Sequence, residues 1–336
     1  MFGKNANKGG RMKKLLWPIV ILFLAPFQAA GQDMARAVYA ENAFQAWVQA
    51  AGISKAAIAI GYEGALIHTA GIGQEADDPS DVASLSKAIT AMCLADVLAE
   101  NGLSFSARIG DILEGELPEE SANLTIAQFV SHGSGLDEDE TQDQMRRWVG
   151  ESANRHQDAA ERAFARGPNM AQVGQYNYNN ENYAVLGWLI SALTGEPYIQ
   201  TCKTRIFGEG TMGASDRWGA FAAWGGWQIS AEDYLHFVHR YFGAGSDMAH
   251  YPESYPNVYL GRSKYYGMGS FWRQSRGGGF NFWHAGRLCF RGAGNSAGAY
   301  FASYAGKWSV SVNYGACITR DRQNELDALL WRALNE

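Results

Sequence analysis

The sequence has no long hydrophobic run, no basic cluster beyond the N-terminal RMKK, and no internal repeat or low-complexity segment. Its longest apolar stretch, Leu15 to Phe27, is about 13 residues long, whereas a membrane-spanning helix needs roughly 20. Acidic residues are dispersed and the formal net charge is -6, so the chain offers no basic surface of the kind that binds nucleic acid. We therefore expect neither nucleic-acid binding nor a stable membrane span in the mature chain.

Cysteine is also scarce, with 4 residues among 336. Cys93, Cys202, Cys289 and Cys317 lack the spacing of metal ligands, and we predict neither a metal nor an organic cofactor. Cys93 lies in an apolar helical segment and is interpreted as a small core residue. Cys289 and Cys317 both fall in strand-like segments near the C-terminus and can be neighbours, although the number of cysteines fixes no pairing.

The N-terminal segment RMKKLLWPIVILFLAPFQAAGQ has the three parts of an export signal. Basic residues precede the apolar run, and the small residues Ala29, Ala30 and Gly31 follow it, as signal peptidase prefers. No cysteine follows closely, which argues against lipoprotein processing. We predict a signal peptide over residues 1–30 and a periplasmic or secreted mature chain, with an uncleaved anchor as the alternative. Met12 is an alternative start to Met1.

The rest of the chain divides into strand-rich ends and a helical middle. The patterns predict a helix at 34–50, two strands around a turn at Glu63 and Gly64, and mainly helices from 103 to 250. Aromatic and β-branched segments then predict strands at Tyr265–Arg273, Phe280–His284, Ala297–Tyr304 and Trp308–Ile318, before a last helix at Arg320–Leu334. We expect an α/β (α+β) fold. Residues 34–80 and 255–336 would form one antiparallel sheet flanked by helices, and a mainly helical part, 81–254, would be inserted.

A helix predicted at Leu85–Leu98 carries a lysine in its first turn, where the helix dipole disfavours a cation. Asp81 or Ser84 can cap this helix and Gly102 can end it. Burial near a helix N-terminus lowers the pKa of Lys87, so its amine can act as a base. Ser84 lies three residues earlier, where the same N–H groups would stabilise an oxyanion. The spacing predicts Ser84 as a nucleophile activated by Lys87; the alternative is a Lys87 that extends to solvent.

Two further segments carry polar side chains suited to a cleft. Tyr178 and Asn180 lie in the loop before a helix that begins at about Asn182. A tyrosine there can relay a proton and an asparagine can orient an amide or the lysine; helix capping is the alternative. His284 and Gly286 lie on a predicted strand edge, where glycine permits close backbone approach. Taken alone, such a histidine is more often structural than catalytic.

In chain order, SLSK at 84–87, YNN at 178–180 and HAG at 284–286 resemble the motifs of the penicillin-recognising serine hydrolases. The resemblance is to the branch that holds class C β-lactamases, serine DD-peptidases, and related serine esterases and D-amino-acid amidases. The segments LTIAQFVSHGSGL, WGGWQISAEDYLHF and YYGMGSFW also fit that branch, so the likeness runs from about residue 40 to the C-terminus. It implies a β-lactamase/transpeptidase-like fold.

The resemblance also implies a role for each matching residue. Ser84 would be the nucleophile, Lys87 and Tyr178 the general-base pair, and Asn180 an orienting residue. The oxyanion hole would be formed by the backbone N–H groups of Ser84 and Arg287, which follows HAG.

The HAG motif departs from the KTG found in most β-lactamases of this branch. His284 is mostly neutral at pH 7, and Ala285 lacks the hydroxyl that would bind a substrate carboxylate. Arg287 or Arg291 can supply positive charge instead. Aromatic residues near the motifs suit an apolar acyl or alcohol group, although core packing explains most of them equally well. These residues are Trp224, Trp227, Trp272, Phe280, Phe282 and Trp283.

Two other strings compete with these assignments. GNSAG at 294–298 matches the nucleophile elbow of α/β-hydrolases, but a strand is predicted after it and no histidine follows His284. Tyr255-Pro256-Asn257 repeats the YxN pattern without a following amphipathic helix. We therefore prefer Ser84 and Tyr178.

Together these patterns predict an exported serine hydrolase that forms an acyl-enzyme with a small-molecule or peptide substrate, without a cofactor. The substrate would be an ester, a D-amino-acid amide or peptide, or a β-lactam, and HAG with the aromatic residues favours the first two. The alternative is a catalytically silent penicillin-binding-like sensor or binding protein. Such a protein would not need the base that Lys87 and Tyr178 provide.

Overall fold

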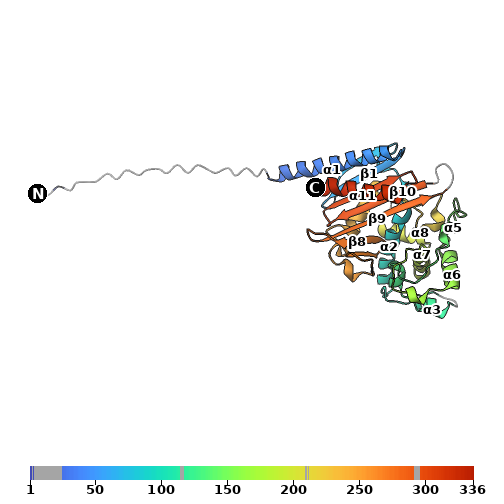
Figure 1. The fold of residues 1–336 in the computed structure, drawn as a ribbon. Helices are drawn as coiled ribbons and strands as arrows, with labels where there is room; N and C mark the ends of the chain where they lie inside the picture. Colours follow the sequence, from blue (N-terminus) through green and yellow to red (C-terminus); the bar gives the residue numbers. More distant parts are fainter. Residues whose placement is uncertain (2, 4–24, 114–116, 209, 211, 291–295) are drawn as a thin grey trace.

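The computed structural model describes residues 1, 3, 25–113, 117–208, 210, 212–290 and 296–336 (Figure 1). Most of the predicted signal peptide, including Met12, lies outside the described residues, as does Arg291. Within the described part of the chain, no helix is both long and apolar enough to cross a membrane.

Both ends of the chain contribute to one antiparallel sheet, as the sequence predicted. Among the described residues it has 8 strands in the order β2-β1-β11-β10-β9-β8-β7-β6. The pairing of β1 with β11, for example Ile58 opposite Val312, joins the N-terminal hairpin to the C-terminal strands. The strands are β1 (Ala56–Tyr62), β2 (Ala65–Ile72), β6 (Val258–Tyr259), β7 (Lys264–Gly267), β8 (Ser270–Gln274), β9 (Phe280–Cys289), β10 (Ser296–Tyr304) and β11 (Trp308–Tyr314).

Helices cover both faces of this sheet (Figure 1). Alternate residues of β11 point to opposite faces, so Val310 and Val312 pack with the terminal helices α1 (Ala25–Ala50) and α11 (Arg320–Asn335). The small side chain of Ser311 and the amide of Asn313 face the other side. On that side β11 contacts α9 (Ala231–Phe242). The short side chains of the strand allow this helix to approach closely.

The segment between β2 and β6 supplies the helical part of the molecule. Its helices are α2 (Ser86–Glu100), α3 (Glu119–Ala122), α4 (Ile126–Val130), α5 (Thr141–Gln144), α6 (His156–Arg166), α7 (Glu181–Thr194), α8 (Tyr198–Ile206), α9 and α10 (Asp247–His250). A small sheet in the order β3-β5-β4 lies beside them, formed by β3 (Ser80–Asp81), β4 (Gly213–Ala214) and β5 (Trp227–Ile229). Cys93 on α2 is not a free core thiol, because it forms a disulfide with Cys202 on α8.

Several element boundaries differ from those predicted. Residues Ala83–Leu85 form a 3-10 turn, η1, and α2 begins only at Ser86, without a side-chain cap. The segment predicted as one strand at Tyr265–Arg273 is a hairpin of β7 and β8, because Met268 and Gly269 adopt positive φ values of 50° and 74°. A Cβ on Gly269 would lie 2.3 Å from the backbone nitrogen of Ala88, so glycine lets this turn pack against the start of α2.

Candidate active site

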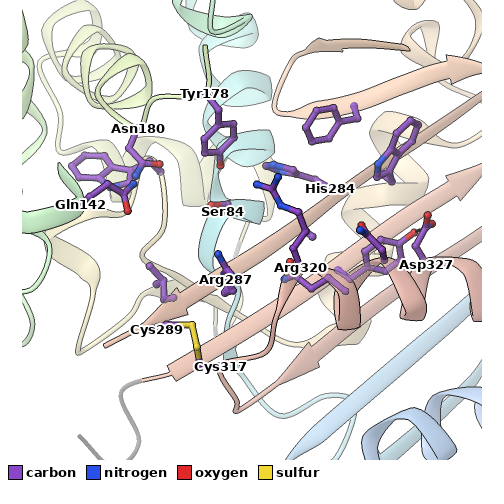
Figure 2. A pocket seen from close by; sticks show the side chains of 18 of the residues that line it. Ser84, Gln142, Tyr178, Asn180, His284, Arg287, Cys289, Cys317, Arg320 and Asp327 are labelled. Atoms are coloured by element: carbon purple, nitrogen blue, oxygen red, sulfur yellow. Dashed lines mark hydrogen bonds between the residues drawn. A yellow bond between two sulfur atoms is a disulfide. The ribbon is translucent and has the colours of Figure 1, made fainter. Parts of the chain in front are cut away.

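A cleft of about 920 Å³ lies between β9 and the helical part of the molecule. Five residues predicted from the sequence line it: Ser84, Tyr178, Asn180, His284 and Arg287. They come from η1, the loop before α7, and β9. Figure 2 shows the hydroxyl of Tyr178 directed at Ser84, with His284 and Arg287 on neighbouring parts of the wall.

The turn that carries Ser84 is strained and is pressed against β9. Ala83 has a φ of 49°, a value that residues other than glycine rarely adopt and that recurs at functional sites. A Cβ on Gly286 would lie 2.4 Å from the carbonyl oxygen of Val82 and 3.0 Å from the backbone nitrogen of Ser84. The glycine of HAG is thus required for the close approach of β9 to the serine turn.

Lys87 lies beneath the cleft with 0% of its surface exposed. Its Nζ lies 2.8 Å from Asn180 Oδ1, 2.8 Å from the carbonyl oxygen of Trp224 and 3.3 Å from Ser84 Oγ. Burial lowers the pKa of Lys87 to about 7, and the negative charge of Asp139 acts in the opposite direction. A large fraction of this amine is therefore neutral near neutral pH.

A polar network holds Asn180 against the lysine. Its Nδ2 donates to Thr141 Oγ1 at 3.0 Å, so its Oδ1 is the atom left to face Lys87. Asp139 accepts hydrogen bonds from Thr141 Oγ1 at 2.5 Å and from the backbone nitrogen of Asn180 at 3.2 Å. Sequence reasoning missed Asp139 and Thr141, because no local motif connects them with a residue some 40 positions away.

The ring of Tyr178 covers the amine of Lys87, with Nζ 4.9 Å from the ring centroid. Burial raises the pKa of the Tyr178 phenol, and its hydrogen bond with Ser84 acts in the opposite direction. Tyr178 is therefore protonated at neutral pH and can donate its proton.

His284 and Arg287 lie where β9 extends beyond its neighbour β8, whose pairing ends at Trp283. The predicted strand edge therefore exists only on the side of β9 that faces β8, because β10 pairs with β9 on the other side. His284 is buried, and burial together with the nearby charge of Lys87 lowers its pKa to about 3. It is a neutral residue in the folded protein. Arg287 is exposed and donates to the carbonyl oxygen of Ile318 at 3.2 Å.

The structure adds three cations that the sequence did not reveal. Arg146, Lys264 and Arg320 line the same cleft as Arg287, and none of the four forms an ion pair within the described residues. The one carboxylate among the described lining residues is Asp327, which accepts a hydrogen bond from Tyr300. The side chain of Arg320 extends from the start of α11 toward the cleft (Figure 2). The wall is thus positively charged although the chain is acidic overall.

The aromatic lining is only partly the one expected. Trp224 and Trp283 line the cleft, whereas Trp227, Trp272 and Phe282 are buried in the core and Phe280 packs against it. Four other aromatic residues line the cleft: Tyr176, Phe271, Phe290 and Tyr300.

The competing strings lie elsewhere or have the wrong geometry. Tyr255 and Asn257 are not among the lining residues, and the short strand β6 follows them. Ser296 begins β10, so the helix that a nucleophile elbow requires does not follow it. Within the described ranges, no three or more His, Cys, Asp or Glu side chains are arranged to hold a metal ion.

Comparison with known proteins adds a family and a shared fold. A family model described as Beta-lactamase matches residues 40–307. The fold is similar to that of a D-stereospecific amidohydrolase from Streptomyces sp., with a TM-score of 0.68 and 18% identity over 87% of this chain and 97% of that one. A penicillin binding protein from Bacillus halodurans gives a TM-score of 0.67 and 18% identity, over 85% and 98% of the two chains. A D-amino acid amidase from Ochrobactrum anthropi SV3 gives 0.64 and 15%, over 84% and 97%.

Proposed function

The chain belongs to the β-lactamase family, and on that premise we propose that it is an exported serine hydrolase that acts through an acyl-enzyme on Ser84. The observation that carries this proposal is the burial of Lys87 with its amine 3.3 Å from Ser84 Oγ. A buried lysine with a pKa of about 7 is a base at neutral pH. A protein that only bound its ligand would gain nothing from that arrangement.

The hydrogen bonds of Lys87 fit the neutral amine. Its two partners at 2.8 Å, Asn180 Oδ1 and the carbonyl oxygen of Trp224, are both acceptors and account for the two N–H bonds of a neutral amine. The remaining lone pair can accept the proton of Ser84 Oγ. That transfer leaves a serine alkoxide ready to attack a carbonyl carbon.

In the acylation step, Ser84 Oγ bonds to the substrate carbonyl carbon while Lys87 takes the serine proton. The carbonyl oxygen becomes an oxyanion, for which we propose the backbone N–H groups of Ser84 and Arg287 as donors. The bond to the leaving group then breaks, and Tyr178 gives its proton to the departing nitrogen or oxygen. The proton held by Lys87 restores the tyrosine. A water molecule, deprotonated by the same pair, then bonds to the acyl carbon, the ester bond to Ser84 Oγ breaks, and the proton taken from the water returns to Ser84 Oγ.

For the substrate we propose an ester or a D-amino-acid amide or peptide. The aromatic side chains of Trp224, Trp283 and Phe271 offer apolar contacts to an acyl group. Similarity to a D-stereospecific amidohydrolase and a D-amino acid amidase supports the D-residue substrate. A β-lactam is less well supported, since the neutral His284 and the methyl group of Ala285 supply neither charge nor hydroxyl to its carboxylate, which would depend on Arg287 or another cation of the wall instead.

The test is intact-protein mass spectrometry after brief incubation with a fluorophosphonate, a penicillin or a short-chain p-nitrophenyl ester, followed by peptide mapping. We expect the fluorophosphonate adduct on the Ser84 peptide, and turnover of the ester or of a D-phenylalanine p-nitroanilide. Ser84→Ala and Lys87→Ala should abolish turnover, and Tyr178→Phe should reduce it by about 10²- to 10⁴-fold. Ser296→Ala is the matched serine control and should remain active.

The pH dependence of labelling tests the role of Lys87 separately. Below a pH of about 7 the amine is protonated and cannot accept the serine proton, so the rate should rise as the pH increases through that value and then level off. Labelling of Ser296 with Ser84 untouched, or a rate independent of pH between 5 and 9, would contradict the proposal.

A further inference from the structure

His132 is a buried histidine that the proposed mechanism does not use. It follows α4, and 1% of its surface is exposed. Its ring lies against that of Tyr178, with 4.5 Å between the ring centroids and an interplanar angle of 39°. The rings of Tyr183 and Tyr266 enclose it at 5.2 Å and 4.9 Å.

The backbone on both sides of Tyr178 is hydrogen-bonded to this one residue. The nitrogen of Asn177 donates to the carbonyl oxygen of His132 at 2.9 Å. The nitrogen of Asn179 donates to His132 Nδ1 at 3.3 Å. Tyr178 is thus fixed from its N-terminal side, from its C-terminal side and across its ring by His132.

The neighbouring hydrogen bonds determine the tautomer of the imidazole. Ser134 Oγ donates to Asn182 Oδ1 at 2.6 Å, and Asn182 Nδ2 donates to the carbonyl oxygen of Asn179 at 3.1 Å, so the orientation of the Asn182 amide is fixed. The same Nδ2 lies 3.2 Å from His132 Nδ1. Two N–H donors therefore converge on Nδ1, which assigns it as an acceptor and places the ring proton on Nε2, a buried atom without a hydrogen-bond partner in the described part of the chain.

The charge and backbone of His132 are also constrained. Burial lowers its pKa well below the usual range, and the positive charge of Lys87 acts in the same direction. A cation here would face two donors and would stand beside the lysine. The φ of 59° is a strained value for histidine, and strain of this kind persists where the surrounding structure holds a functional residue in place.

We propose that His132 is a positioning residue that, as a neutral Nδ1 acceptor, holds the hydroxyl of Tyr178 at the Ser84–Lys87 pair. The inference rests on the proposed function. Through the bonds to residues 177 and 179 it fixes the height of the tyrosine above the cleft floor. Through the ring contact it limits the rotation of the phenol.

The test compares two amide variants in the full-length protein. His132→Asn keeps an acceptor near the position of Nδ1 and tolerates a positive φ, whereas the carbonyl of His132→Gln reaches only toward Nε2. With a p-nitroanilide substrate we expect kcat to fall about 100-fold for the Gln variant and less than about 10-fold for the Asn variant. KM should change little in both, since His132 does not touch the substrate. His239→Gln, at a half-buried histidine whose ring lies against β1, is the control and should retain wild-type kcat.

A double-mutant cycle with Tyr178→Phe separates positioning from a general structural role. A p-nitrophenyl ester should give measurable rates in that background, because its leaving group needs no proton, while its deacylation still uses the proposed Lys87–Tyr178 pair. If His132 acts through Tyr178, substitution of His132 should lower kcat by less than about 3-fold in the Tyr178→Phe background. The proposal would be overturned if substitution of His132 lowered kcat by the same factor with and without the Tyr178 hydroxyl. It would also be overturned if the Asn and Gln variants lost the same factor in kcat. If the Gln variant does not fold, the same cycle with His132→Asn decides.

Failure of this inference is distinguishable from failure of the proposed function. Fluorophosphonate labelling of Ser84 in the unsubstituted protein tests the function alone. If Ser84 is labelled and both His132 variants turn over at the wild-type rate, only the positioning role is wrong.

Discussion

At the scale of single residues, the geometry of the site depends on two glycines, which have no side chain, as much as on the residues that line the cleft. Gly286 permits β9 to approach the serine turn, and Gly269 permits the β7–β8 turn to rest on the start of α2. Neither requirement follows from the residue's own sequence neighbours. Each arises from a contact with a segment far away in the sequence, Val82 for Gly286 and Ala88 for Gly269.

Substitution of Gly286 by alanine should disable the site without unfolding the protein. The added methyl would meet the carbonyl oxygen of Val82 at 2.4 Å and would move β9 away from Ser84, which opens the proposed oxyanion hole. Loss of one such donor costs about 10²- to 10³-fold in kcat. Gly277→Ala is the matched control, because a Cβ there meets nothing within 4 Å, and it should keep full activity. Steady-state kinetics of both variants make the comparison, and an active Gly286→Ala protein would contradict it.

Local spacing decided which site residues could be predicted. Ser84 and Lys87 are one helical turn apart, and Tyr178 and Asn180 share one loop, so their patterns are visible in the sequence. Arg146, Lys264 and Arg320 come from three separate parts of the chain and meet only in the fold. No pattern within one segment marks them. His132 lies in the segment LTIAQFVSHGSGL that fits the family branch, but that pattern does not indicate its contact with Tyr178.

At the scale of elements, the part of β9 that extends beyond β8 is bonded to the segment before α11. Cys289 forms a disulfide with Cys317, and Arg287 donates to the carbonyl oxygen of Ile318. Both bonds lie at the cleft wall, beyond the point where β8 stops pairing. The sequence allowed these two cysteines to be neighbours without fixing a pairing, although Cys317 lies after β11 and not in a strand. The pairing of Cys93 with Cys202 was not, because it joins two helices whose packing the sequence does not specify.

Removal of the Cys289–Cys317 disulfide should therefore affect both stability and substrate binding. For a closed loop of 28 residues, the chain-entropy model gives a loss of about 3 to 4 kcal/mol in the free energy of unfolding. We also expect a higher KM in the Cys289→Ser/Cys317→Ser protein, because Arg287 and Arg320 flank the bond. Urea unfolding and steady-state kinetics measure the two effects. The Cys93→Ser/Cys202→Ser protein serves for comparison, and unchanged stability in the first variant would refute this account.

At the scale of the whole molecule, neutral histidines are a common feature of the core. Burial lowers the pKa of His156 and of His284 to about 3, and that of His132 well below its usual range. The unfolded chain takes up these protons near pH 6.5. Between about pH 6.5 and 3 the unfolded state thus binds more protons, and stability falls as the pH falls. Burial raises the pKa of Glu181 to about 7, which has the opposite effect on the pH dependence of stability. The three histidines outweigh this one carboxyl group.

The free energy of unfolding should therefore decrease between pH 7 and pH 5, by roughly 2 kcal/mol for each of these histidines. His156 accepts a hydrogen bond from the nitrogen of Ala223 and is not among the residues that line the cleft. In the His156→Gln protein, the free energy of unfolding should accordingly decrease by roughly 2 kcal/mol less between pH 7 and pH 5. Urea unfolding at several pH values tests this, and a curve for the variant parallel to that of the wild type would show the assignment to be wrong.

The architecture was predictable because the chain ends have short segments typical of strands, rich in aromatic and β-branched residues near the C-terminus, and the middle has helical patterns. The sheet from both termini was correctly expected, since the glycine turns separate its strands clearly. The hairpin of β7 and β8 was missed, because the positive φ of Met268 has no signal in a run of aromatic residues. The order of strands and the layer made by α1 and α11 depend on pairing across the whole chain, which periodicity alone does not report.

The pairing of β1 with β11 also bears on the moment at which the protein can fold. Strand β1 finds one partner in its own hairpin, but the other is the last strand to be synthesised. Helix α1 likewise packs on α11, which follows β11 in the chain. Closing so large a loop is entropically costly and slow, and the sheet cannot close before β11 has been synthesised. Late closure of the sheet would suit the export that we propose, because a chain whose sheet is still open can be threaded through a membrane.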